Sequence, residues 1–345
     1  MLAAAGRFGE QLRVGFDLGT SVQGLPDGRG ITSVVVCGMG GSGITGDVLQ
    51  AALAERAPVA VIASKGYGAP LFCGPDTLVL AVSYSGNTEE TNAAFEAAVA
   101  RGSRVVAVAS GGELLRRAGK SGSVASVRVP SDAIAPRAAL GYLVGAALGA
   151  VGAAGVCDGE ALRREVEEVG SRLKTAADRL GPGAPSDRNE AKRLAAWLRD
   201  ATPLVWGTEG VAETAAKRWK TQLNENAKTP AFWGALPELD HNEVEGWSGG
   251  AGHGFRAAIL RSRFEPDAMD GRVSATLEAM ASVGLETREV WGEGEGALEQ
   301  LFSLILMGDY VSIYLAILRG VDPTPIPLLS ALKTRREALK REPGT

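Results

Sequence analysis

The chain has 345 residues and a formal net charge of −4, with 45% hydrophobic and 22% charged residues. This length allows two domains of ordinary size, and the composition is that of a folded globular protein rather than a disordered one. The lack of a basic excess argues against a nucleic-acid partner and against binding to an anionic membrane surface.

Further limits on the class of protein come from the cysteines, the histidines and the apolar runs. Three scattered cysteines without a CxxC pair indicate reduced thiols, packed as small apolar side chains in a cytoplasmic protein. Only two histidines, His241 and His253, argue against a metal site built on imidazole, although carboxylates could still bind a metal. Two long apolar runs, residues 138–156 and 301–318, are diluted by glycine and alanine or interrupted by Asp309. We expect both to be buried helices rather than membrane spans.

From residue 31 the first half of the chain alternates between β-branched apolar runs and helical runs. The predicted strands cover residues 31–39, 57–64, 76–84, 103–110 and 124–130. The predicted helices cover residues 42–55, 88–102, 112–122 and, as a long alanine-rich helix, about 137–156. Strands that alternate with helices indicate βαβ units and a parallel sheet covered on both faces.

The same alternation of strands and helices begins again after a connector. A charged amphipathic helix over residues 158–180 leads into "GPGAPSD", the clearest linker signal in the chain. We then predict strands over 202–207, 256–262 and 286–292 and helices over 211–228, 271–284 and 296–320. The predicted organisation is a first domain, a helical connector with its linker, a second domain and a C-terminal tail helix, over residues 1–155, 156–195, 196–318 and 319–345 respectively.

Two glycine- and hydroxyl-rich loops follow strands of the first predicted sheet. "GMGGSG", residues 38–43, comes after the first strand, and "SYSGNTEET", residues 83–91, comes after the third. In a parallel sheet both loops lie at the carboxyl edge, where ligands bind. Backbone N–H groups and hydroxyls at a helix start suit a phosphate. The candidate phosphate ligands are Gly40, Gly41, Ser42, Ser83, Ser85 and Thr88, the last placed as a helix N-cap.

Other interpretations of these loops remain open. "GMGGSG" also satisfies the G-x-G-x-x-G pattern of a dinucleotide site, which would make the protein an NAD-dependent oxidoreductase. Against this, the second strand ends in "VIASKG", which offers no Asp or Glu for a ribose hydroxyl. Each loop taken alone could also serve only to cap its helix.

Together, "CGMGGSG" and "SYSGNTEET" resemble the two phosphate loops of the sugar isomerase (SIS) domain. In the second half, "KTQLNENAKTP" with Glu225 and "LPELDHNEVEGW" with His241 resemble the bifunctional phosphoglucose/phosphomannose isomerase family. "PRAAL" with Arg137 and the tail "DPTP…LLSALK" with Lys333 match the same pattern, so that the resemblance covers essentially the whole chain. It implies an α/β fold of two SIS domains, flavodoxin-like sandwiches with parallel sheets, and a C-terminal helical tail that contributes to the active site.

The resemblance implies an aldose–ketose isomerase that interconverts glucose 6-phosphate and mannose 6-phosphate with fructose 6-phosphate through an enediol. It implies no metal or other cofactor, a role in glycolysis and gluconeogenesis, and a cytoplasmic homodimer in which His241 reaches the partner's active site. The residue types suit this chemistry. Glu225, at a helix C-terminus, fits the proton shuttle, and His241 fits ring opening because histidine titrates near neutrality. Arg137 or Lys333 would stabilise developing negative charge.

Rival functions follow from the same features. A non-catalytic SIS regulator would bind a sugar phosphate and a partner protein without turnover, and it would not need Glu225. An isomerase for a pentose or amino-sugar phosphate would use the same loops. Residue by residue, Glu225 and Lys333 could be solvated charges, Arg137 a surface charge, and His241 a structural residue hydrogen-bonded to its neighbours.

Overall fold

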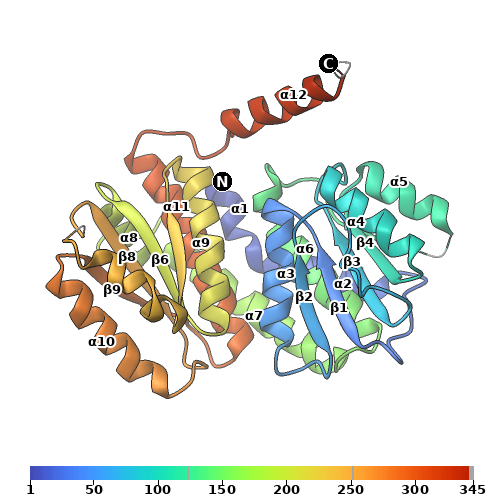
Figure 1. The fold of residues 1–345 in the computed structure, drawn as a ribbon, viewed down its shortest axis with the longest axis horizontal. Coiled ribbons are helices and arrows are strands. Elements are labelled where there is room, and N and C mark those ends of the chain that lie inside the picture. The colour runs from blue at the N-terminus through green and yellow to red at the C-terminus, as the bar shows by residue number, and fades with distance from the viewer. Residues whose placement is uncertain (123, 251, 342–345) are drawn as a thin grey trace.

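The computed structural model describes residues 1–122, 124–250 and 252–341, which form two α/β domains side by side and a separate C-terminal helix (Figure 1). Residues 342–345 of the predicted tail lie outside the described residues. The predicted fold class is correct: each domain is built on a parallel sheet with helices packed against it. The C-terminal helix α12, Pro327–Arg341, lies above the gap between the domains and extends over the first (Figure 1).

The first sheet has five parallel strands in the order β2-β1-β3-β4-β5. All five were predicted, and they span β1 Ser33–Cys37, β2 Ala60–Ser64, β3 Thr77–Val82, β4 Arg104–Ala109 and β5 Ala125–Arg128. The central strands β1 and β3 are buried along their whole length, as expected for β-branched runs covered by helices on both faces. This order brings the ends of β1 and β3 side by side at the carboxyl edge.

The helices of the first domain include two that the sequence did not predict. The expected helices are α3 Gly40–Leu53, α4 Glu89–Ala100, α5 Gly112–Ser121 and α6 Leu140–Ala153, with a short 3₁₀ turn, η1 Pro136–Ala138, before α6. The additional helices, α1 Leu2–Gly6 and α2 Phe8–Ser21, begin the chain. Glycines such as Gly15 and Gly19 weaken the helix signal of α2. They are needed there because a Cβ at Gly19 would collide with the Ala146 carbonyl oxygen of α6.

The second sheet has four parallel strands in the order β7-β6-β8-β9. The bounds of its strands are β6 Thr202–Thr208, β7 Phe232–Leu236, β8 Phe255–Arg261 and β9 Glu286–Trp291. The helices of this half are α7 Gly159–Leu180, α8 Glu190–Leu198, α9 Val211–Ala227, α10 Ala268–Ser282 and α11 Ala297–Leu318, with 3₁₀ turns η2 Glu238–His241 and η3 Glu243–Trp247. The sequence did not predict α8 or β7. The edge strand β7 lacks a buried face at its start, since Phe232 and Trp233 are exposed, and therefore carries no strand periodicity.

Helix α11 is long and apolar enough to cross a membrane by length and composition alone, with a mean hydropathy of 2.0 over its most apolar window. Of that window, 83% is buried inside the protein. Helices α7, α8 and α9 pack around it, and α9 also contacts α3 of the first domain. It is therefore a core helix, as expected from Asp309 in its middle, and it joins the connector to the second domain.

Candidate active site

The first predicted phosphate loop ends in the N-terminus of α3. Gly40 has φ of +54°, and the side-chain oxygen of Ser42 accepts a hydrogen bond from the backbone N–H of Tyr84 at 3.0 Å. Tyr84 belongs to the second loop, so this bond holds the two loops together across neighbouring strands. A Cβ at Gly41 would lie 3.0 Å from both the N and Cα atoms of Arg137. Glycine at this position therefore lets the loop approach the η1 turn closely.

The second loop is tied together by its own hydroxyls. The Ser83 and Thr88 hydroxyl oxygens lie 2.9 Å apart, and the N–H of Gly86 donates to Ser83 Oγ at 3.1 Å. Thr88 is the N-cap residue of α4, as predicted, but its side chain bonds Ser83 rather than the helix. Ser85 Oγ accepts from the N–H of Asn87 at 3.2 Å. Hydroxyls, backbone N–H groups and the start of α4 thus gather at one place, which is what a phosphate requires.

Arg137 is the central cation of the site and is only 2% exposed. Its guanidinium donates to Asn226 Oδ1 at 2.7 Å and to the carbonyl oxygens of Pro323 and Thr324 at 2.6 and 2.9 Å. It also lies 3.4 Å from the Glu225 carboxylate. Burial lowers the pKa of Arg137, and the partners around it compensate for the lost hydration. Its burial excludes the alternative that Arg137 is a surface charge.

Glu225 sits in the last turn of α9, and its side chain is 23% exposed. It comes from the second domain, whereas Arg137 comes from the first. The segment after α11 completes this junction: the N–H of Thr324 donates to Asp322 Oδ1 at 2.8 Å, and this turn presents the Pro323 and Thr324 carbonyls to Arg137. The candidate base and cation thus meet where the two domains and the start of the tail converge.

A buried ion pair holds the backbone of Arg137 in place. Arg218 of α9 pairs with Asp309 of α11 at 3.0 Å and donates to the Arg137 carbonyl oxygen at 2.7 Å. Asn226 is held in turn, because its amide donates to Ser312 Oγ at 2.9 Å. No role was predicted from sequence for Arg218, Asn226 or Ser312. The available signal was Asp309, because an acid in the middle of an apolar helix requires a buried partner.

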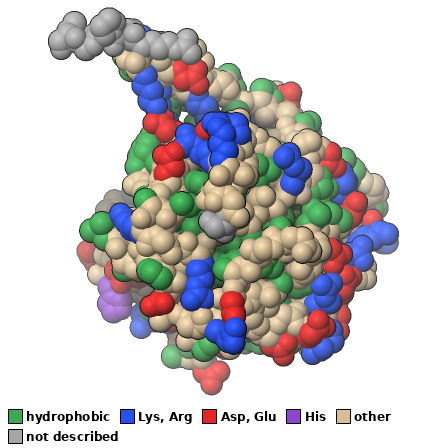
Figure 2. Space-filling view, turned by 90° about the vertical axis from the view of Figure 1, so that its right-hand side faces the viewer, with side chains coloured by type: hydrophobic (Ala, Val, Ile, Leu, Met, Phe, Trp, Pro, Cys, Tyr) green, Lys and Arg blue, Asp and Glu red, His purple; other side chains and the backbone are tan. Residues whose placement is uncertain are grey.

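The remaining predicted residues lie farther out. Lys333 is exposed on α12 and, with Ser85, Asn87 and Thr88, lines a hollow of about 270 Å³ above the second loop. The helix is held there by Arg336, which bonds Tyr67 at 2.6 Å and Glu89 at 3.2 Å. Figure 2 shows basic and acidic side chains meeting where this projecting helix approaches the body of the protein.

His241 ends the 3₁₀ turn η2 after β7 and is exposed. Within the described ranges, no hydrogen bond or ion pair links it to Glu225 or Arg137. Its neighbour Asp240 is the residue tied to the fold, through Thr276 and Arg272 of α10. The structure therefore brings Glu225, Arg137 and the first loop together, and places Lys333 over the second loop, but leaves His241 apart within one chain.

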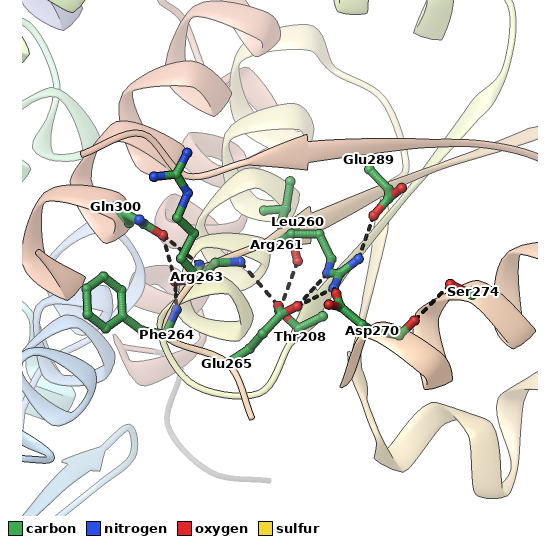
Figure 3. A network of polar contacts seen from close by, with 11 residues as sticks. Thr208, Leu260, Arg261, Arg263, Phe264, Glu265, Asp270, Ser274, Glu289 and Gln300 are labelled. Carbon is green, nitrogen blue, oxygen red and sulfur yellow. Dashed lines mark hydrogen bonds and ion pairs between the residues drawn. The ribbon is translucent and has the colours of Figure 1, made fainter. Parts of the chain in front are cut away.

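At the carboxyl edge of the second sheet, charged side chains of the protein pair with one another (Figure 3). Arg261, at the end of β8, is 3% exposed and pairs with Glu265, Asp270 and Glu289. The Glu265 carboxylate also accepts from the Thr208 hydroxyl and the Ser262 N–H. The Glu265 carboxylate thus accepts hydrogen bonds from a hydroxyl, a backbone N–H and a guanidinium of its own chain, the kinds of donor that hold a bound anion.

Comparison with known proteins shows that the chain is similar to enzymes of phosphorylated sugars. Residues 30–118 match the model of the SIS domain, and residues 187–335 match that of the bacterial phospho-glucose isomerase C-terminal SIS domain. The chain is 34% identical, over 96% of its length and 97% of the relative's, to the bifunctional phosphoglucose/phosphomannose isomerase of Caldicellulosiruptor bescii. It is 34% identical to the protein of that name from Aquifex aeolicus, with coverage of 89% and 90%. A D-glucosamine-6-phosphate 4-epimerase from Sulfolobus acidocaldarius is 25% identical, with coverage of 91% and 92%.

Solved structures share the fold at lower sequence identity. The C-terminal domain of glucosamine-fructose-6-phosphate aminotransferase from Francisella tularensis aligns with a TM-score of 0.69 and 13% identity, over 94% of this chain and 98% of that one. A glucose-6-phosphate isomerase like protein from Thermus thermophilus aligns with a TM-score of 0.58 and 22% identity, over 87% and 85%. These likenesses show that the chain shares the fold of both structures, and the two family matches identify its α/β domains as SIS domains.

Proposed function

Because the chain belongs to the bifunctional phosphoglucose/phosphomannose isomerase family, we propose that it interconverts glucose 6-phosphate and mannose 6-phosphate with fructose 6-phosphate. The observation that carries this proposal is the meeting of Arg137 and Glu225 beside the first phosphate loop. A carboxylate base, a buried cation and an anion cradle are the groups that aldose–ketose isomerisation needs.

In the proposed mechanism the two loops of the first domain hold the substrate phosphate. Gly40, Gly41 and Ser42 act from the first loop, and Ser83, Ser85 and Thr88 from the second. Binding energy at this remote group then positions C1 and C2 of the open-chain sugar against the base. The loops also bind without a formal positive charge of their own, which favours release of the product.

Glu225 moves the proton between C1 and C2. It removes a proton from one carbon, and the electron pair forms the double bond of an enediol while the carbonyl oxygen takes up a proton. The proton on the Glu225 carboxyl exchanges with solvent while the enediol is bound. Glu225 then delivers a proton to the other carbon, as the hydroxyl on the first carbon loses its proton to solvent and becomes the new carbonyl. Arg137 stabilises the negative charge that develops on the oxygens. Lys333 is proposed to assist from α12, which already lies over the second loop. Since the enediol is planar at C2, its collapse gives either epimer once the sugar rotates about C2–C3.

Ring opening is assigned to His241, with the help of a second subunit. We infer a cytoplasmic homodimer in which the exposed His241 of one protomer reaches the site of the other. In support, His241 is exposed at the end of η2, and within the described residues no hydrogen bond or ion pair joins it to Glu225 of its own chain. Mixing inactive Glu225→Gln and His241→Ala proteins under subunit exchange should restore activity, because one site of each hybrid dimer is intact. Activity in a proven monomer would contradict this arrangement.

The activity itself is tested by incubating EDTA-treated protein with fructose 6-phosphate and separating the products. Glucose 6-phosphate and mannose 6-phosphate should both form. Formation of one aldose alone would remove the dual specificity, and binding without product would favour a non-catalytic regulator. Glucosamine 6-phosphate is tested in parallel, because one relative is named a 4-epimerase of that sugar phosphate. Conversion of it alone would redirect the assignment to amino sugars.

A further inference from the structure

Lys228 ends helix α9 in a conformation that its side chain does not favour. It is the C-cap residue, with φ of 51° and ψ of 37°, and among the residues described it is the one non-glycine position with a positive φ. Glycine or asparagine is usual at such a position, because a Cβ is crowded in the left-handed region. A lysine in this conformation implies that interactions of its side chain offset the backbone strain.

The side chain of Lys228 turns back onto the end of its own helix. Its Nζ donates to the backbone carbonyl oxygen of Glu225 at 2.6 Å and approaches that of Asn226 at 3.5 Å. The ammonium thus occupies the negative end of the helix dipole, where carbonyl groups lack helical partners. Its hydrogen-bond partner is the peptide group of the proposed base itself.

Three charged groups face this ammonium from three parts of the chain. Burial lowers the pKa of Lys228, and Arg137 from η1 lowers it further. Asp322 from the turn after α11 and Glu225 from α9 act in the opposite direction. Lys228 is therefore electrostatically coupled to both members of the Arg137–Glu225 pair, and not merely close to them in sequence.

We propose that Lys228 is a positioning residue for Glu225: by bonding the carbonyl of that residue it fixes the last turn of α9 and sets where the carboxylate is presented to the sugar. This inference rests on the proposed function for its catalytic readout. The coupling between the two side chains is independent of that function and can be measured without turnover.

Three variants separate this role from simple helix capping. Lys228→Met removes the charge and the bond, Lys228→Gly also removes the left-handed strain, and Lys228→Arg keeps a charge. Lys220→Met, on the same helix, is the matched control. We expect Met and Gly to lower kcat by about 10- to 100-fold with KM changed about twofold or less, because a small displacement of a base is costly. Lys228→Arg should restore part of the rate, because it keeps a cation at the end of α9.

The glycine variant is the sharpest of the three, since glycine is the preferred residue for a left-handed helix end. It should keep or raise the melting temperature while losing activity. A glycine variant with wild-type kcat would overturn the proposal and leave Lys228 as a structural cap. Loss of activity that follows only the melting temperature across the three variants would overturn it too.

The coupling is measured by NMR titration of the lysine ¹³Cε signals, with Lys228 assigned by its absence in Lys228→Met. In Glu225→Gln the pKa of Lys228 should fall further, because a carboxylate that raises it has been removed. An unchanged titration would contradict the coupling. If wild-type protein converts no sugar phosphate, the proposed function fails, whereas this titration still decides the link between Lys228 and Glu225.

Discussion

The guanidinium of Arg137, in the first domain, lies 3.4 Å from the carboxylate of Glu225, in the last helical turn of α9 in the second domain. The same guanidinium bonds two carbonyl groups in the segment that leads to the tail helix. One buried side chain thus joins the phosphate-loop domain, the candidate base and the C-terminal segment. The site should exist only in the intact chain, and neither domain alone should turn over substrate.

Replacing Glu225 by glutamine should lower kcat by about 10²- to 10⁴-fold, the range typical for loss of a general base. KM should change much less, since the phosphate loops are untouched. Steady-state kinetics in both directions would measure this. Glu213→Gln is the matched control on the first turn of α9, where Glu213 pairs with Lys217, and it should stay close to wild type. Equal losses in the two variants would remove Glu225 from the chemistry.

Gly41→Ala should weaken substrate binding, because its Cβ would press against the Arg137 backbone, which cannot yield as a flexible side chain would. We expect KM for fructose 6-phosphate to rise at least about tenfold. Gly119→Ala, where nothing lies within 4 Å of the added Cβ, should bind normally. Calorimetric titration with inorganic phosphate would show whether the loss lies in the anion cradle. Unchanged phosphate binding in Gly41→Ala would place the cradle elsewhere.

Asp309→Asn should destabilise the protein by about 3–5 kcal/mol, because it leaves Arg218 buried without its counter-charge. Activity should fall as well, since Arg218 also holds the Arg137 carbonyl. Chemical denaturation followed by circular dichroism measures the change. Asp200→Asn disrupts an exposed, solvent-screened pair with Arg199 and should leave the free energy of unfolding close to that of wild type. A stable, fully active Asp309→Asn protein would contradict this support for Arg137.

Stability should decline at alkaline pH through Cys37. Burial raises the pKa of this thiol from 9.0 to about 12, so the folded state keeps its proton where the unfolded chain loses it. The resulting stability is complete below pH 9.0 and is lost as pH rises toward 12. The slope should approach about 1.4 kcal/mol per pH unit in that window. Urea titrations at several pH values should show a shallower slope in Cys37→Ala, and identical slopes would rule the thiol out.

The tail residue Lys333 should act on turnover rather than on folding. Lys333→Met is expected to lower kcat/KM by about tenfold or more, because the exposed ammonium faces the second loop. Its melting temperature should match wild type. Thr334→Ala, one position along the same helix and bonded to Ser330 within it, serves as the control. If both variants behave as wild type, the cation of the site is Arg137 alone.

The parts of this fold that were predictable are those with strong local periodicity. The five strands of the first sheet and the helices α3 to α6 carry clear alternation of β-branched and helical runs. Helix α2 was missed because its glycines serve a close helix–helix contact that only the folded chain reveals. Strand β7 was missed because it is a short edge strand with an exposed start.

In the candidate site, too, features with a local sequence pattern could be predicted, whereas features that depend on long-range contacts could not. Residues in loops with a distinctive chemistry, such as the hydroxyls of "SYSGNTEET", could be named as candidates from sequence, and they remain a prediction. The Arg218–Asp309 pair and the Asn226–Ser312 bond depend on positions 91 and 86 residues apart, and no local pattern joins them. Arg137 could not be distinguished from a surface charge until its burial was visible. Long-range pairing, rather than residue type, was the missing information.

The most direct test of the account is fructose 6-phosphate incubated with wild-type protein and with Glu225→Gln in deuterated water, followed by proton NMR. The account predicts that wild type forms glucose 6-phosphate and mannose 6-phosphate together, each with deuterium at C2, and that Glu225→Gln forms neither at a comparable rate. Products without solvent deuterium, or full turnover by Glu225→Gln, would contradict an enediol mechanism with Glu225 as its base.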